Sequence, residues 1–266
     1  MAPFNTHFLV AERIWPEVTA RLSLPETGNG NYFGQFCFGC IAPDVDKISA
    51  TLSQKDTHFY DRSTDYDLMA SHRTVAFLKH QREFFCAPFP DLSPEAQAFG
   101  LGYLCHLCVD EVSKHMWRRE VWLQLKPVYP GTSFAALDEA AMQRIQNFAA
   151  IREAVCSIKV LDVIPCIPFT DLKQMLGGTC CFVRATTIEE AFMALVDFFD
   201  KPGPEERHQK QTFLRTQLNI ARRQIHVFTI DELVNAALTH SRRRLNDLIQ
   251  GRIPEPGYPE LQVSAW

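Results

Sequence analysis

The sequence predicts an all-α fold, and three observations lead to that class. Apolar residues recur at helical spacing along most of the chain. Helix-start signals stand directly before these stretches, namely Ser93-Pro94 and the capping boxes Thr187-Ile-Glu-Glu190 and Thr229-Ile-Asp-Glu232. No segment shows the convincing alternation of apolar and polar residues that a half-buried strand requires. We therefore expect a bundle of many helices.

The first predicted helix covers residues 6–15. Its apolar stripe includes His7 and Ile14, and Asn5 or Thr6 is the candidate N-cap. Further helices are predicted over residues 32–41, 66–85, 96–109, 135–158, 187–200, 204–227 and 229–250.

Proline and glycine residues indicate where some of these helices end. Ala42-Pro43 should end the second helix, and Gly251 stands where a C-terminal cap is expected after the last. The stretch 96–109 is apolar nearly all round, so we expect that helix at the centre. Two segments lack the helical pattern. Residues 43–65 are predicted to be a long loop, and residues 159–186 a linker or a loop that covers the site.

Composition restricts the class of protein. The 266 residues suffice for one large domain or two small ones, and 46% hydrophobic with 22% charged residues is ordinary for a globular chain. The net charge of -4 argues against bulk nucleic-acid binding or an anionic membrane surface. No apolar stretch is long enough for a transmembrane segment, and the start lacks a basic n-region, so we expect a cytoplasmic protein.

The informative residues are polar groups inside apolar helices. His106 and Asp110 are spaced i, i+4, which places both on one face of the central helix. A buried, ionised Asp needs a cation or several hydrogen bonds, and a divalent metal satisfies both side chains at once. A buried His–Asp hydrogen bond that locks two helices explains the pair equally well.

Three further residues favour the metal. His7 lies on the apolar stripe of the first helix, Asp44 follows Pro43, and His58 lies in the predicted loop. Each has an ordinary explanation alone, as a core His, a helix-end Asp and a loop His. Together with His106 and Asp110 they supply nitrogen and oxygen ligands from four segments, without a Cys.

The ordered set of four segments resembles a known family. The segments are Thr-His7-Phe-Leu, Gly-Cys-Ile-Ala-Pro-Asp44, Thr-His58-Phe and Gly-Tyr-Leu-Cys-His106-Leu-Cys-Val-Asp110. In this order they resemble the zinc-dependent phospholipase C family, over roughly the first 120 residues. The resemblance implies a multi-helix bundle of that type, shared with single-strand-type nucleases, and a phosphodiesterase with clustered zinc ions.

The resemblance also implies how the ligands are divided. By position, Asp44, His58, His106 and Asp110 look like the ligands of one metal. Asp110 looks like a bridge to a second metal, which His7 also binds.

Further ligands of the family are only partly matched. His115 matches the next family His if the helix breaks near Ser113, because its spacing from Asp110 otherwise points it to another face. His72 shares the apolar stripe of the helix over 66–85 and is a core residue or an alternative ligand. The family's His-x-x-x-Glu pair for a third metal does not follow anywhere downstream. We therefore expect one or two Zn²⁺ ions, or another divalent metal.

Two cysteine pairs imitate a different zinc site. Cys37-x-x-Cys40 and Cys105-x-x-Cys108 have zinc-ribbon spacing, but both pairs lie in segments predicted to be apolar helices. Free Cys is among the most buried residue types, so core thiols are the preferred interpretation. The chain holds nine Cys, an odd number, which favours free thiols over a complete set of disulfides.

The functional hypothesis is a metal-dependent hydrolase of phosphoric esters, in which a metal-activated water attacks phosphorus. Asp44 is the candidate catalytic residue that orients or deprotonates this water. The substrate would be a small phosphoester or a phospholipid-like molecule. Residues 1–158 would form the metal-binding hydrolase-like region, with residues 159–266 as a helical extension packed into the same domain. Two alternatives stay open: a helical metal-binding scaffold without catalysis, and a non-haem iron oxygenase.

Overall fold

The computed structural model describes residues 4–22, 31–59, 73–116, 130–224 and 230–254. Within these ranges every regular element is helical and no strand occurs, which confirms the all-α fold. The α-helices are α1 (Phe4–Leu22), α2 (Asn31–Gly39), α3 (Gln54–His58), α4 (Arg73–Phe85), α5 (Pro94–Met116), α7 (Pro130–Met142), α8 (Phe148–Ser157), α9 (Phe169–Val183), α10 (Ile188–Phe199), α11 (Pro204–Gln224) and α12 (Ile230–Ile249). Two 3₁₀-helices accompany them, η1 (Ala42–Lys47) and η2 (Phe89–Asp91).

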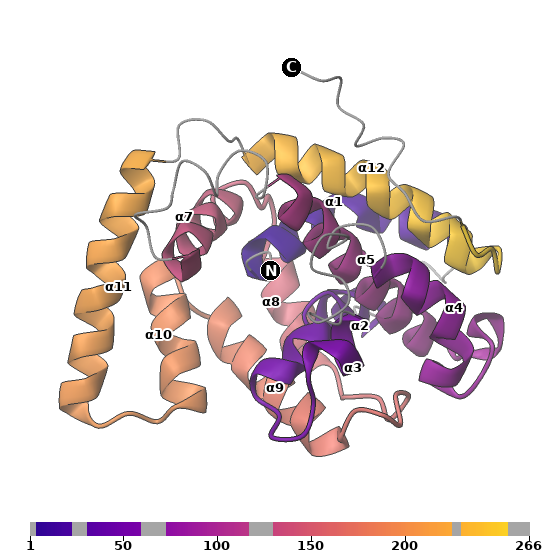
Figure 1. Ribbon diagram of the computed structural model, residues 1–266, viewed down its shortest axis with the longest axis horizontal. Helices are drawn as coiled ribbons and strands as arrows, with labels where there is room; N and C mark the ends of the chain where they lie inside the picture. Colours follow the sequence, from indigo (N-terminus) through magenta and orange to yellow (C-terminus); the bar gives the residue numbers. More distant parts are fainter. Residues whose placement is uncertain (1–3, 23–30, 60–72, 117–129, 225–229, 255–266) are drawn as a thin grey trace.

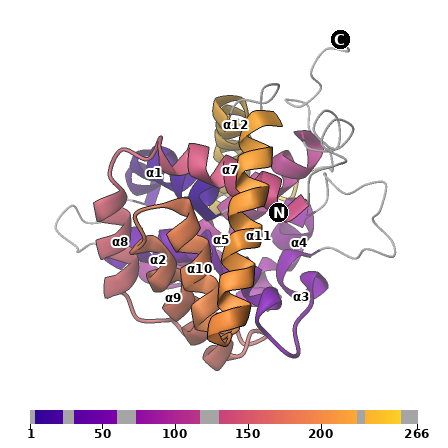
Figure 2. The ribbon, with the colours of Figure 1, turned by 90° about the vertical axis from the view of Figure 1, so that its left-hand side faces the viewer.

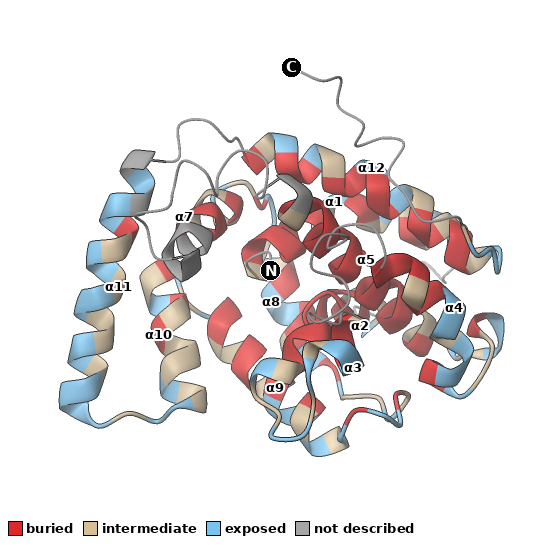
Figure 3. Ribbon diagram, in the orientation of Figure 1, coloured by how far each residue is buried: buried red, intermediate tan, exposed pale blue. Residues whose placement is uncertain are grey.

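Helix α5 is the central element, as its apolar composition predicts. It packs against α2 and α12 and also contacts α1 and α4 (Figure 1). Residues 101–112 of α5 are all buried, whereas α11 at the edge of the molecule is largely exposed (Figure 3). A helix surrounded by other helices has no polar face to solvent, so polar side chains on α5 must find partners inside the protein.

Two glycines allow α2 and α5 to cross in close contact. A Cβ atom on Gly102 of α5 would collide with the carbonyl oxygen of Phe36, and one on Gly39 of α2 would collide with that of Phe99. Only residues without a side chain permit this backbone approach. The crossing brings the C-terminal end of α2, and the start of η1 after it, beside the middle of α5.

The start of α1 differs from the expected cap. Asn5 and Thr6 lie inside the helix, which already includes Phe4, so neither is the N-cap. The buried carboxylate of Asp138 on α7 accepts the backbone N–H groups of Asn5, at 2.5 Å, and Thr6, at 3.3 Å. The N–H groups of a first helical turn have no acceptor within their own helix, and here another helix supplies one.

The expected long loop over residues 43–65 is wrong for its described part. Pro43 lies in the first turn of η1, where its fixed φ angle suits a helix. Ser53 and Asp56 form a capping box that starts α3, and Phe59 ends α3 with a φ of 53°. Short elements of five or six residues show too little periodicity to be recognised in a polar stretch.

The expected break over residues 159–186 is also wrong, because α9 occupies much of it. Gly177 and Gly178 lie inside α9, where the rings of Phe198 and Phe199 on α10 fill the space that a Cβ atom would take. Their function is close packing rather than a turn. The single helix expected over 135–158 is divided in two, since Asn147 caps α8 by accepting the N–H of Ala150 at 3.0 Å.

The C-terminal helices surround the central group. Helices α10 and α11 run antiparallel at one end of the molecule, where α11 also contacts α7 (Figure 2). Helix α12 packs along α5 and α1, so residues beyond 158 contact the helices that carry His7 and His106. The division of the chain at residue 158, into a hydrolase-like region and a helical extension, stays a proposal. None of the helices in the described ranges is both long enough and apolar enough to cross a membrane.

Candidate metal centre

The four predicted segments come together around one point. His7 comes from α1, Asp44 from η1, and His58 from the last residue of α3, while His106 and Asp110 lie one turn apart on α5. All five side chains are buried, with an exposed fraction of 1% or less. They form two overlapping groups that could hold a metal ion, His7–His106–Asp110 and Asp44–His58–His106.

Three donor atoms, those of Asp44, His58 and His106, lie close enough together to share one metal ion, and Asp110 Oδ2 lies near the two imidazoles. His58 Nε2 lies 3.2 Å from His106 Nε2, 3.4 Å from Asp44 Oδ1 and 3.7 Å from Asp110 Oδ2. His106 Nε2 lies 3.9 Å from Asp44 Oδ1 and 4.0 Å from Asp110 Oδ2. Zinc bonds of about 2.0–2.2 Å in tetrahedral geometry separate the ligand atoms by about 3.3–3.6 Å. Small side-chain movements would therefore bring Asp44 Oδ1, His58 Nε2 and His106 Nε2 onto one ion, and Asp110 Oδ2 is a further candidate ligand.

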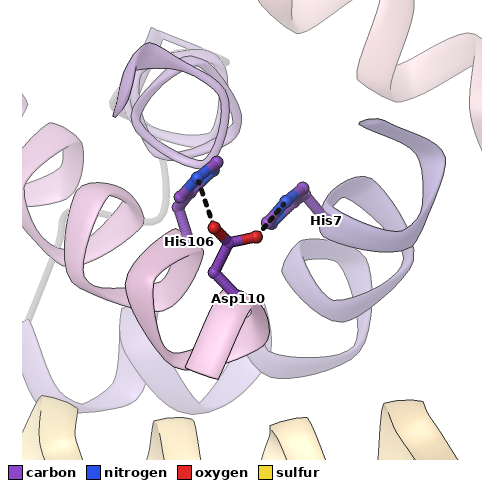
Figure 4. A group of neighbouring side chains, drawn as sticks. All are labelled: His7, His106 and Asp110. Atoms are coloured by element: carbon purple, nitrogen blue, oxygen red, sulfur yellow. Dashed lines mark ion pairs between the residues drawn. The ribbon is translucent and has the colours of Figure 1, made fainter. Parts of the chain in front are cut away.

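Asp110 has the geometry of a bridging carboxylate. Its Oδ2 atom faces His58 and His106, whereas its Oδ1 atom lies 3.9 Å from His7 Nε2. Figure 4 shows the carboxylate between the two imidazoles of His106 and His7. The His7 ring stacks on the His106 ring with centroids 4.1 Å apart and an interplanar angle of 2°. The arrangement permits one metal beside His58 and a second between Asp110 and His7.

A backbone contact orients the His106 ring. The carbonyl oxygen of Cys40 lies 2.7 Å from His106 Nδ1, so Nδ1 carries the proton and donates to it. The lone pair of Nε2 then points into the cluster, which is the tautomer that a metal requires. Cys40 follows α2 directly, so this bond depends on the close crossing of α2 and α5 at Gly39 and Gly102.

His58 is oriented by the local structure of α3. The Thr57 hydroxyl donates to the Ser53 carbonyl at 3.4 Å, which leaves its lone pairs to accept from His58 Nδ1 at 2.8 Å. The phenol of Tyr103 on α5 donates to the Thr57 carbonyl at 2.5 Å and fixes this turn against the central helix. His58 Nε2 is thereby directed toward Asp44 and His106.

Electrostatics favour neutral imidazoles and ionised carboxylates. Burial lowers the pKa of His106 to about 4, and burial together with the neighbouring His106 lowers the pKa of His7 well below its ordinary value. Burial alone would raise the pKa of Asp44, but Lys47 and the nearby imidazoles outweigh it and hold that pKa far below its ordinary value. Neutral His and ionised Asp are the protonation states that bind divalent metals.

Two cations beside the carboxylates were not predicted from the sequence. Arg73, at the start of α4, is buried and donates from Nη1 to Asp110 Oδ2 at 3.0 Å. Lys47, at the end of η1, places Nζ 2.5 Å from Asp44 Oδ2 and is one-third exposed. In the sequence, Arg73 is a charged residue beside an apolar helix, and Lys47 follows Asp44 by three residues. Both patterns are common on protein surfaces.

Unsatisfied polar atoms support the fit to a metal. Both ring nitrogens of His7 are buried without a hydrogen bond among the described residues, and Asp44 Oδ1, unlike the Oδ2 atom that pairs with Lys47, also lacks one. Buried polar groups nearly always have partners, so a cluster of unsatisfied donors and acceptors indicates a bound ion or water. Imidazole and carboxylate ligands without thiolate suit Zn²⁺.

The remaining candidates are not part of this cluster as described. Helix α5 continues through Ser113 to Met116, so the break that His115 would need is absent there, and the side chain of His115 lies outside the described residues. His72 lies outside the described residues altogether. All nine cysteines are free, and none belongs to either metal-binding group of the described chain.

Comparison with known proteins identifies the family. A family model described as zinc dependent phospholipase C matches residues 6–143, more than half of the chain and the whole stretch that contains the five clustered residues. Searches of curated proteins and of solved structures found no match. The matched segment begins within α1 and includes the central helix α5. With its helical fold and its buried His and Asp cluster, the chain belongs to the zinc dependent phospholipase C family.

Proposed function

We propose that the protein is a zinc-dependent hydrolase of phosphoric esters, with one or two ions held by His7, Asp44, His58, His106 and Asp110. The observation that carries this proposal is the buried cluster itself, in which Asp44 Oδ1 lies 3.4 and 3.9 Å, and Asp110 Oδ2 3.7 and 4.0 Å, from the Nε2 atoms of His58 and His106. Family membership supports the reaction class. A bound zinc ion would supply Lewis acidity toward the phosphoryl oxygens and would lower the pKa of a water molecule.

Asp44 is the proposed catalytic residue. Its Oδ1 atom faces the imidazoles, while its Oδ2 atom is paired with Lys47 toward the exposed side of the cluster. The low pKa keeps the carboxylate ionised at neutral pH, so it can accept a hydrogen bond from the attacking water and orient it. Lys47 limits the rotation of this carboxylate, because the ammonium group holds Oδ2 while Oδ1 stays directed at the cluster.

The substrate proposed is a small phosphoester or a phospholipid-like molecule. Lys47 is the cation of the cluster that reaches solvent, since its side chain is one-third exposed while Arg73 is buried. Its Nζ atom also lies 5.8 Å from the centre of the Phe4 ring. A cation beside an aromatic ring suits a substrate that joins a phosphate group to an apolar part.

The test is hydrolysis of bis(p-nitrophenyl) phosphate and of a short-chain phosphatidylcholine by the protein loaded with zinc. We expect activity that a chelator abolishes and added zinc restores. Metal binding with no turnover on either ester would support a structural scaffold instead, and iron in the purified protein would support an oxygenase. Rapid hydrolysis in the presence of excess chelator would contradict the proposal.

A further inference from the structure

A second cluster of buried polar side chains lies beside the candidate metal centre. Glu111 follows Asp110 on α5 and is completely buried. Successive residues on a helix point about 100° apart, so Asp110 faces the imidazoles while Glu111 faces α4 and α12. In Figure 4 helix α12 runs along α5 on the side away from His7 and His106. The two acidic residues thus connect the metal centre with two other helices.

Glu111 caps the start of α4 from another helix. Its Oε1 atom accepts the backbone N–H of Thr74 at 2.8 Å, and its Oε2 atom accepts the Thr74 hydroxyl at 2.9 Å. Thr74 is the second residue of α4, where backbone N–H groups have no partner within the helix. A carboxylate at this position acts as an N-cap and also interacts favourably with the helix dipole.

The capped turn carries the cation that contacts Asp110. Arg73 immediately precedes Thr74, and its Nη1 atom donates to Asp110 Oδ2 at 3.0 Å. This oxygen is also the one that faces His58 and His106. The position of the Thr74 backbone therefore influences which way the Asp110 carboxylate is held.

His240 on α12 completes the connection. Its Nε2 atom lies 2.8 Å from Glu111 Oε2, the same oxygen that accepts the Thr74 hydroxyl, and both side chains are fully buried. A buried carboxylate depends strongly on each of its hydrogen bonds. Without His240, the Glu111 carboxylate would lose one of its hydrogen bonds and would be free to rotate. The first turn of α4, which carries Arg73, would then lose the cap that holds it.

We propose that His240 is a positioning residue for the metal centre, acting through Glu111 and Thr74 on Arg73 and thereby on Asp110. The inference rests on the proposed function, since it concerns the same metal centre. It gives α12, which lies beyond the family-matched residues 6–143, a defined part in the site. Residues that orient metal ligands commonly change metal affinity by about 10–100-fold when they are removed.

The experiment measures zinc affinity by competition with a chelator in the full-length protein. His240→Leu removes the contact with Glu111 and should weaken zinc binding at least about 10-fold. His240→Gln retains an N–H donor near the position of Nε2 and should restore binding to within about 3-fold of wild type. Ser241→Ala is the matched control, because Ser241 is equally buried on α12 and contacts Cys105 Sγ at 3.7 Å rather than Glu111.

A second readout separates positioning from general stability. The visible spectrum of the cobalt-substituted protein reports the metal's ligand geometry, and we expect it to change in His240→Leu but not in Ser241→Ala. Unchanged zinc affinity in His240→Leu, or equal weakening in His240→Leu and Ser241→Ala, would overturn the inference. If His240→Leu does not fold, Thr74→Val takes its place, and its unchanged affinity would overturn the inference. Failure of the wild-type protein to bind zinc would refute the proposed function itself.

Discussion

The two carboxylate oxygens of Asp110 have different partners. Oδ2 accepts from the Arg73 guanidinium and faces the imidazoles of His58 and His106, whereas Oδ1 faces His7. Burying an ionised carboxylate costs several kcal/mol unless charge and hydrogen bonds offset it. Arg73 offsets part of this cost in the absence of a metal. The permanent cation also shares the oxygen that a zinc ion would use.

Removal of a ligand from the central helix should remove the metal. We expect His106→Ala and Asp110→Ala each to reduce bound zinc to below a tenth of the wild-type level and to abolish hydrolysis, because the cluster loses a candidate ligand. Elemental analysis after gel filtration provides the measurement. His80→Ala is the control, since His80 is exposed on α4 and its Nδ1 atom lies 2.7 Å from Glu83 Oε2. Wild-type metal content in both ligand variants would show that the site is misplaced.

Asp44→Asn should affect turnover more than folding. The amide keeps the shape of the side chain but cannot act as a base, and it binds a divalent cation less well. We expect the hydrolysis rate at saturating zinc to fall about 100-fold or more, with a small change in the thermal midpoint. Asp91→Asn, at an exposed position in η2, is the control. A large loss of stability together with unchanged turnover would show that Asp44 has only a structural role.

At the scale of single residues, the sequence predicted which His and Asp residues cluster better than it predicted their partners. His7, His106 and Asp110 are conspicuous because a polar side chain within an apolar helical segment has few explanations. Glu111, Arg73 and His240 interact across three helices, and no spacing within one segment reveals such contacts. Asp138 was missed for the same reason, since it caps α1 from α7.

At the scale of elements, the metal centre depends on how closely α2 approaches α5. The Cys40 carbonyl reaches His106 Nδ1 only because Gly39 and Gly102 bring the two backbones together. Long periodic helices such as α5 and α12 were predicted from their apolar spacing. η1 and α3 were missed as short polar elements, and α9 was missed because its two glycines resemble a break. Whether a glycine marks a turn or a close contact is decided by a distant partner.

Gly102→Ala should separate these two helices. The new methyl group would overlap the Phe36 carbonyl, and backbone cannot move away as a flexible side chain does. We expect a loss of about 1–3 kcal/mol in the free energy of unfolding, which is typical of overpacking in a core.

The same substitution should weaken zinc binding, because the Cys40 carbonyl would withdraw from His106 Nδ1. Chemical denaturation in the presence of a chelator and zinc titration measure the two effects separately. Gly203→Ala is the control, since a Cβ atom there has no neighbour within 4 Å. Equal behaviour of the two variants would contradict the importance of the close crossing.

At the scale of the whole molecule, the cluster joins segments that are far apart in sequence. α1 is held by Asp138 of α7 and contacts α12, while α5 is held by α2, α4 and α12. A metal ion bound by His7, Asp44, His58 and the two α5 ligands would therefore connect the start of the chain with its centre. Binding to the folded state alone adds about 2.7 kcal/mol of stability when free zinc is 100 times its dissociation constant.

The number of ions follows from how the donors are divided. Asp44, His58, His106 and Asp110 Oδ2 can complete one site, whereas His7 and Asp110 Oδ1 leave a second ion with few protein ligands. We therefore expect one firmly bound zinc and a weaker second ion that is lost on dialysis. His7→Ala should lower the zinc content by at most about one ion per chain and leave the first site occupied, because His7 stacks on His106 without being among the first four donors. Elemental analysis before and after dialysis measures both numbers. Three tightly held ions per chain would contradict this division and would require ligands beyond these five, such as His115 or His72.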